Sequence, residues 1–171
     1  KPFSARELIA RVSSNLELAR TRRIAADALR QLNERLADES KRLNLMFGQA
    51  PTFMAMLTGP DHVFTLANPA YVQLVGHRDI LGQPLRDALP EVVGQGFVDL
   101  LDTVYRSGEA YVGKGSTVSL QRVPGAPASD RVVDFVFQPI MDSDGQVAGI
   151  FIQGSDVTDR ARAEALRVAQ N

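Results

Sequence analysis

The sequence of 171 residues contains no cysteine. This absence excludes disulfide bonds, thiolate nucleophiles and cysteine-ligated zinc. No apolar run approaches the ~18 residues that a membrane span needs, and no signal-peptide pattern is present. We therefore expect a cytoplasmic protein without a membrane partner.

Glycine is also absent from the first 47 residues, where Pro2 is the only proline. This stretch is rich in Ala, Leu, Arg and Glu, all of which favour helix. Ser4 is a candidate N-cap, and Glu7 completes a capping-box pattern three residues later. The sequence therefore predicts one long N-terminal helix.

A heptad pattern runs through this helix, because apolar residues recur at spacings that alternate between four and three. Arg22 and Glu39 are polar at seam positions, where they weaken the pairing but favour one register. A helix that folds back onto its own domain is the alternative. The pattern favours a parallel homodimer, with a seam that includes Leu29, Leu32, Leu36, Leu43 and Met46.

The net charge of −1 hides an asymmetry along the chain. Residues 1–47 carry ten basic and six acidic side chains, whereas the remainder carries nine basic and fourteen acidic ones. A basic helix is one sign of nucleic-acid binding. Here the basic residues are interleaved with acids and no stripe of aromatic residues accompanies them, so we expect a solvated helix face and no nucleic-acid partner.

Five segments after Gly48 have the composition of short strands separated by turn residues. In the fourth, Val133, Phe135 and Phe137 share one face, with polar Asp134 on the other. Short connections predict an antiparallel sheet. The strands fall as two within 52–66, then 111–122, 131–140 and 146–154.

Short helices separate the second strand from the third. Asn68 is a candidate N-cap and Gly76 a stop for the first of them. Two helical turns follow in 79–92, 96–108 has clear helical spacing, and a last helix covers 160–171. The order predicts an α+β fold: a five-stranded antiparallel sheet with the short helices on one face, preceded by the long helix.

The segment from about Leu45 to Thr158 resembles a PAS domain, the sensory module of bacterial signalling proteins. The residues that carry the resemblance are "NPAYVQLVG", "ILGQPLRDALPE" and "GIFIQGSDVTDRARAE". In that family an Asp-x-Thr motif ties the sheet to the outgoing helix, and Asp156 and Thr158 match it. A carboxylate there also suits a helix N-terminus. The resemblance implies that these two residues transmit the signal.

Both ends of the chain carry further resemblances. The opening "KPFSARELIARV" resembles the end of a response-regulator receiver domain, in which Lys1 matches a phosphate-contacting lysine. The closing "DVTDRARAEALRVAQN" resembles the linker to the dimerisation helices of a histidine kinase. The implied partners are an upstream receiver domain and a downstream kinase domain in one protein. The implied divisions are 1–24 (receiver remnant), 25–47 (coiled-coil linker), 48–158 (PAS domain) and 159–171 (signalling helix).

Signs of catalytic or metal chemistry are weak. Gly108, Gly113 and Lys114 have phosphate-loop spacing, but Gly115 stands where Ser or Thr must hold magnesium. His62, in a predicted turn, is expected at the surface, as is His77, and no metal site is expected. We expect this segment not to be an enzyme.

The resemblance also bears on cofactors. Flavin light sensors of the family use a cysteine, which this chain lacks, and haem-binding members place a histidine on the long helix, where 97–107 has none. No cofactor is therefore expected, although an unidentified small ligand remains compatible with the core. Tyr71 and Tyr105 are its best polar contacts. The candidates for an apolar pocket, which equally could simply be core, are Phe64, Leu66, Tyr71, Leu85, Phe97, Leu101, Tyr105, Phe135, Phe137 and Phe151.

The leading hypothesis is a dimeric sensory module that relays a signal through its flanking helices to a histidine kinase. One alternative keeps the module but places a diguanylate cyclase downstream. Another is a small-molecule-binding protein that uses the pocket.

Overall fold

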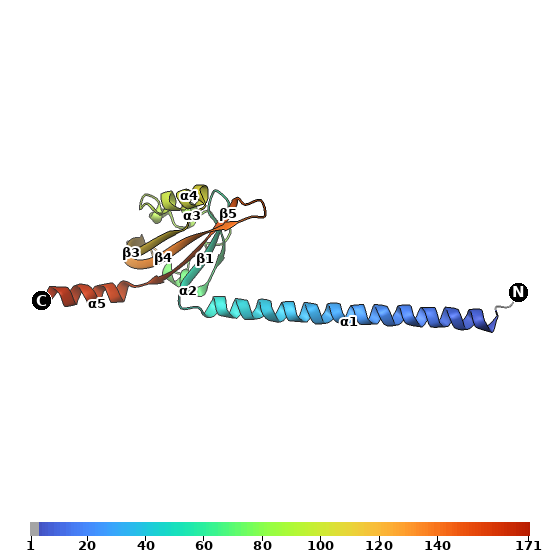
Figure 1. The fold of residues 1–171 in the computed structure, drawn as a ribbon. Coiled ribbons are helices and arrows are strands. Elements are labelled where there is room, and N and C mark those ends of the chain that lie inside the picture. The colour runs from blue at the N-terminus through green and yellow to red at the C-terminus, as the bar shows by residue number, and fades with distance from the viewer. Residues whose placement is uncertain (1–3) are drawn as a thin grey trace. The chain divides into compact units, whose positions relative to one another are not determined.

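A computed structural model describes residues 4–171 (Figure 1). The chain divides into two compact units, Lys1–Met46 and Phe47–Asn171. Lys1, the expected phosphate-contacting position, lies outside the described residues. Among residues 4–171, no helix is long and apolar enough to cross a membrane.

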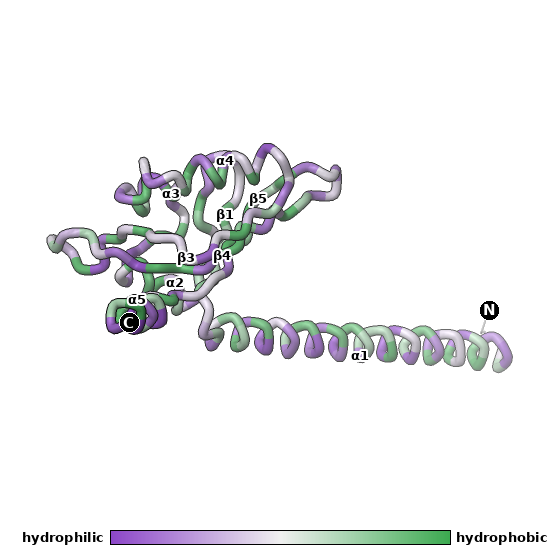
Figure 2. Tube along the Cα trace, turned by 60° about the vertical axis from the view of Figure 1, so that its left-hand side comes forward, coloured by the Kyte–Doolittle hydropathy of each residue, from purple (hydrophilic) through white to green (hydrophobic). Residues whose placement is uncertain are grey.

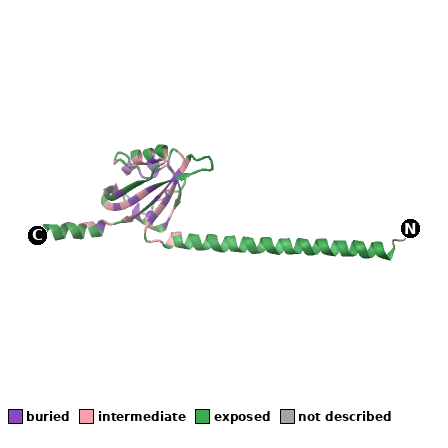
Figure 3. Ribbon diagram, viewed as in Figure 1, coloured by how far each residue is buried: buried purple, intermediate pink, exposed green. Residues whose placement is uncertain are grey.

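The long helix α1 covers Ala5–Gln49, so it fills the first unit and ends inside the second. The hydroxyl of Ser4 accepts a hydrogen bond from the backbone N–H of Glu7 at 3.2 Å, which confirms the predicted N-cap. Apolar and polar residues alternate along the helix (Figure 2). None of its residues is buried (Figure 3), and the predicted seam residues Leu29, Leu32, Leu36, Leu43 and Met46 are 53–61 % exposed.

The second unit is built on a five-stranded antiparallel sheet, as predicted (Figure 1). The strand order is β2-β1-β5-β4-β3. The first and last strands in sequence, β1 and β5, are therefore neighbours at its centre. Asp142 accepts hydrogen bonds from the N–H groups of Asp144 and Gln146 and so stabilises the β4–β5 turn. The strands are β1 (Phe53–Thr58), β2 (Val63–Ala67), β3 (Tyr111–Leu120), β4 (Ser129–Met141) and β5 (Val147–Asp156).

The short helices follow the capping signals of the sequence. The side chain of Asn68 accepts from the N–H of Tyr71 at 3.0 Å and begins α2, and Gly108, at a φ of 70°, ends α4. A left-handed φ suits glycine, which has no Cβ to clash. The helices are α2 (Pro69–Leu74), α3 (Leu85–Ala88), the 3-10 turn η1 (Pro90–Val92), α4 (Phe97–Ser107) and, after the sheet, α5 (Thr158–Ala169).

The core lies between the sheet and the short helices. Val133, Phe135 and Phe137 of β4 are all buried on one face, as their period of two predicted. The helices contribute Tyr71, Leu101 and other apolar side chains to the same cluster. These side chains give the second unit a single core, and the candidate pocket lies inside it.

Candidate functional site

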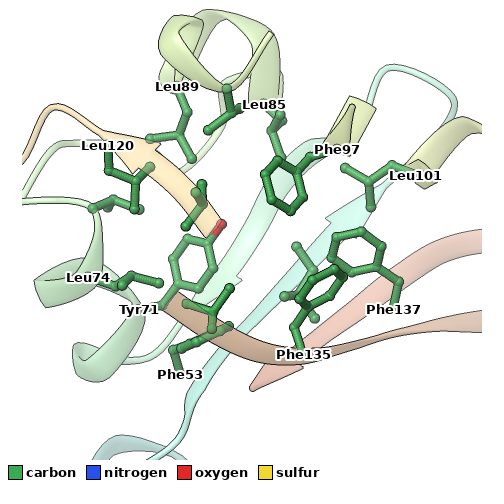
Figure 4. A pocket seen from close by; sticks show the side chains of 15 residues that line it. Phe53, Tyr71, Leu74, Leu85, Leu89, Phe97, Leu101, Leu120, Phe135 and Phe137 are labelled. Carbon is green, nitrogen blue, oxygen red and sulfur yellow. The ribbon is translucent and has the colours of Figure 1, made fainter. Parts of the chain in front are cut away.

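An apolar cavity of about 70 Å³ lies within this core (Figure 4). Its walls come from both layers: β1, β3, β4 and β5 of the sheet, and α2, α3, η1 and α4 of the helices. The lining residues are Phe53, Tyr71, Leu74, Val75, Leu85, Leu89, Val92, Phe97, Leu101, Val118, Leu120, Val133, Phe135, Phe137 and Ile152.

Six of the ten predicted pocket residues line this cavity. Two others are nearby but do not line it: Phe64 is fully buried behind Tyr71, with ring centroids 5.7 Å apart, and Tyr105 is half-buried against the ring of His62. The six that line it are Tyr71, Leu85, Phe97, Leu101, Phe135 and Phe137.

The expectation that Leu66 faces the core is wrong, because a β-bulge reverses the face of the residues that follow it. Leu57 pairs with Phe64, but the next residue, Met56, pairs with Leu66, so that Thr65 is the extra residue. One inserted residue shifts a period of two by one step. Leu66 therefore lies on the outer face and is 55 % exposed.

Phe151 also lies on the outer face, contrary to expectation. Its strand neighbours Ile150 and Ile152 are both buried, and alternation turns the side chain between them away from the core. All three residues are apolar, so the sequence pattern alone did not distinguish the two faces. The cross-strand partners of Phe151, Met56 and Gln138, identify the outer face.

Nine lining residues were not among the predicted set. Four of them, Leu74, Val75, Leu89 and Val92, lie in short helical turns or in the loops after them, where so short an element carries no periodic signal. The other five, Phe53, Val118, Leu120, Val133 and Ile152, lie in strands. The alternation of buried residues in β1 could have identified Phe53, and that in β4 could have identified Val133.

The Tyr71 hydroxyl is the polar group of this apolar cavity. Figure 4 shows its oxygen directed into the space between the helical layer and the sheet. Burial raises the pKa of this hydroxyl above its usual value, and the charge of Arg78 lowers it by less, so the group stays neutral. None of the described residues, 4–171, hydrogen-bonds the hydroxyl, which leaves it available to a ligand.

The dimensions and composition of the cavity limit what it holds. Its volume exceeds that of a single water site, which needs about 10–15 Å³. It is well below the roughly 300–1,000 Å³ of sites for drug-sized ligands. None of its lining residues is cysteine or histidine, the residues that the family uses for a flavin adduct or for haem.

His62 is buried, contrary to the expectation of a surface turn residue. It adopts a left-handed φ of 55°, and its Nε2 lies 2.7 Å from Oδ1 of Asp102 on α4. The second ring nitrogen, Nδ1, is buried without a partner. His77 is exposed, as expected. In residues 4–171 no three His, Cys, Asp or Glu side chains gather as metal ligands.

The junction between β5 and α5 is fastened to β4 by Thr158. This residue is 2 % exposed. Its hydroxyl oxygen accepts from the N–H of Val132 at 3.0 Å, and both its hydroxyl and its N–H donate to the carboxylate of Asp156. The N–H of Val157 donates to the carbonyl of Val132 at 2.8 Å. Two hydrogen bonds to Val132 of β4 thus hold the start of α5 to the sheet.

A second contact joins the first turn of α5 to β4. Arg160 donates to Asp134 at 3.1 Å, and the N–H of Gly115 donates to the same carboxylate at 2.7 Å. The N–H of Gly115 and the charge of Arg160 hold the pKa of Asp134 below its usual value, against a smaller effect of desolvation. This exposed contact adds a second link between α5 and β4.

Solved structures resemble this one. A structure of an RNA-binding Light-Oxygen-Voltage receptor has a TM-score of 0.56 and 19 % identity, and the match covers 77 % of this chain but only 37 % of that one. The PAS domain of BvgS from Bordetella pertussis has a TM-score of 0.53 and 24 % identity, with 78 % and 95 % covered. VqmA bound to DPO has a TM-score of 0.52 and 21 % identity, with 67 % and 56 % covered. At these identities the likeness shows the fold alone.

A comparison of sequence families agrees with the fold. Residues 47–162 match the family described as the PAS fold. This range contains the sheet, the cavity and the β5–α5 junction. The chain therefore belongs to the PAS family.

Proposed function

We propose that this chain is the sensory and dimerisation module of a cytoplasmic two-component protein, and that it relays a signal through α1 and α5 to a downstream histidine kinase. The carrying observation is the junction at Asp156 and Thr158, which fastens the outgoing helix to β4. Because β4 also supplies Phe135 and Phe137 to the cavity wall, a change in the cavity reaches α5 through one strand.

The sheet topology supports the same proposal. The incoming helix precedes β1 and the outgoing helix follows β5, and these strands are paired from Phe53 to Thr58. A displacement of β1 or β5 is thus transmitted to both α1 and α5. A shift between two states needs a free-energy difference of only a few kcal/mol.

The full-length parent protein tests the phosphorelay role. Incubated with labelled ATP, it is expected to form a phosphohistidine, stable to alkali and labile to acid, at a residue beyond Asn171. The Thr158→Val substitution is expected to change the rate of labelling without abolishing ATP binding. Formation of a cyclic dinucleotide from GTP without phosphohistidine would contradict the proposal.

The unpaired Tyr71 hydroxyl favours a second candidate function, small-molecule binding in the cavity. The cavity suits a small, uncharged, mainly apolar molecule with one hydrogen-bonding group. The fold relative VqmA, solved bound to DPO, offers a precedent for a bound small molecule. Native mass spectrometry is expected to detect a non-covalent adduct that Tyr71→Phe weakens, and a ligand-free protein from every source tested would count against this candidate.

A further inference from the structure

Asn68 is fully buried, and both polar atoms of its side-chain amide are hydrogen-bonded. Its Oδ1 accepts from the N–H of Met54 at 2.8 Å and from the N–H of Tyr71 at 3.0 Å. Its Nδ2 donates to the carbonyls of Thr52 at 2.9 Å and Phe47 at 3.2 Å. Two accepted and two donated bonds are all that one amide group makes.

The partners of Asn68 lie in three separate elements. Phe47 is in the last turn of α1, and Tyr71 is in the first turn of α2. Met54 lies in β1, and Thr52 directly precedes that strand. The last four carbonyls of a helix have no partner within the helix. The carbonyl of Phe47 is one of these four, and Asn68 supplies its hydrogen bond from 21 positions along the chain.

The same amide group also touches the wall of the cavity. The helix α2, which Asn68 caps, carries Tyr71 and Leu74, and both line the cavity. Asn68 directly precedes this helix of six residues. A movement of this wall therefore displaces Asn68, and the carbonyl of Phe47 must follow or lose its bond.

We propose that Asn68 is the positioning residue through which the state of the cavity reaches the last turn of α1. This inference rests on the proposed sensing function and adds an incoming route to the outgoing one at Thr158. Capping of α2 needs only Oδ1. The two donor bonds of Nδ2 add nothing to the cap, but they connect α2 to β1 and to α1.

The two halves of the amide can be separated by substitution. Asn68→Ser retains a short side-chain oxygen that caps α2, but it removes the donors to Phe47 and Thr52. Arg122→Met is the matched control: Arg122 donates to the carbonyls of Leu74 and Gln73 and so fixes the other end of α2 without touching α1. Both variants loosen α2, but only the first disconnects it from Phe47.

The state of the cavity is changed by Val118→Ile, which adds one methylene to its wall. Hydrogen exchange of the amides in 45–50 is the measurement. In the otherwise native chain, Val118→Ile is expected to change their exchange rates by roughly two- to tenfold, the range that one buried hydrogen bond accounts for. The same change is expected when Val118→Ile is combined with Arg122→Met. No change is expected when Val118→Ile is combined with Asn68→Ser.

Two results would overturn the proposal: an unchanged rate at 45–50 when Val118→Ile is made in the native background, or the same response in the Asn68→Ser background. If either of these exchange results is found but phosphohistidine forms in the parent protein, the proposed role of Asn68 is wrong and the proposed kinase output stands. If the exchange results are as expected but no phosphohistidine forms, the proposed kinase output is wrong and the role of Asn68 stands.

Discussion

At the scale of single residues, an ion pair between Arg78 and Glu91 joins the loop after α2 to η1. Arg78 donates to Oε2 of Glu91 at 3.0 Å and to the carbonyl of Val75 at 2.8 Å, and the N–H of Gln121 donates to Glu91 at 3.3 Å. Desolvation raises the pKa of Glu91, but the bonds from Arg78 and the backbone together outweigh it. The pKa of Glu91 is therefore lowered.

A lowered pKa in the folded state sets the pH dependence of stability. The contribution of Glu91 is complete above its unfolded-state pKa and is lost as the pH falls through the lower folded-state pKa. Glu91→Gln is expected to reduce the free energy of unfolding by about 1–2 kcal/mol at pH 7 and much less in acid. Urea denaturation at both pH values measures this.

The exposed Glu109, which makes no ion pair with the described residues, provides the control for this test. Glu109→Gln is expected to leave stability unchanged at both pH values. An equal loss at pH 7 and in acid for Glu91→Gln would show that the charge of Glu91 is not what stabilises the loop.

Gly113 determines where the ring of Phe135 lies. The two residues are paired across β3 and β4, and a Cβ at Gly113 would lie 2.4 Å from Cε1 of that ring. Gly113→Ala is expected to push the ring toward the cavity and to destabilise the fold by about 1–3 kcal/mol, as overpacking does. Thermal unfolding measures the effect.

A double-mutant cycle isolates this contact. Phe135→Leu makes room for the new methyl group. Gly113→Ala is therefore expected to destabilise the Phe135→Leu variant less than it destabilises the native chain. Strict additivity of the two substitutions would mean that the ring and the glycine do not determine each other's position.

At the scale of elements, the β5–α5 junction depends on one hydroxyl. Thr158→Val removes the acceptor for the half-buried N–H of Val132 and the donor to Asp156. An unsatisfied buried donor costs about 1–3 kcal/mol. We expect a loss of this size in the free energy of unfolding, and faster hydrogen exchange in α5.

Thr103 of α4 offers a matched threonine-to-valine control. Its hydroxyl donates to the carbonyl of Asp99 four residues earlier, in an exposed position. Thr103→Val is expected to change stability by less than about 0.5 kcal/mol, as surface substitutions do. If Thr158→Val behaved in the same way, the junction would not hold α5.

At the scale of the whole molecule, the apolar seam of α1 is exposed along its length. Helices in proteins draw most of their stability from packing an apolar face. We expect the chain to form a homodimer through this seam. Leu32→Glu is expected to weaken association by more than about tenfold, since 1.4 kcal/mol suffices for that factor. Sedimentation equilibrium of the chain measures it.

Ile24 is the control for the dimer, because it is 62 % exposed but lies between the seam positions Arg22 and Leu29 at a spacing that does not match the four-and-three pattern. Ile24→Glu is expected to leave association nearly unchanged. A native chain that stays monomeric at high concentration with its helix intact would contradict the dimer, and equal weakening by both variants would contradict the seam.

Local signals in the sequence determined the order and ends of the elements. Ser4, Asn68 and Gly108 act through bonds or backbone angles within about four residues, so their effect does not depend on the rest of the fold. The alternation in β4 likewise identified Phe135 and Phe137 as core residues. These signals sufficed for the α+β fold and for most of the aromatic wall of the cavity.

Only the tertiary structure decided which side chains meet across the chain. The bulge at Thr65 turned Leu66 outward, His62 packs against Asp102 of α4, and the amide of Asn68 bonds the carbonyl of Phe47 in another element. Each outcome depends on the pairing or packing of segments that lie far apart in sequence. Periodicity and capping carry no information about such partners, because they describe only a residue's own element.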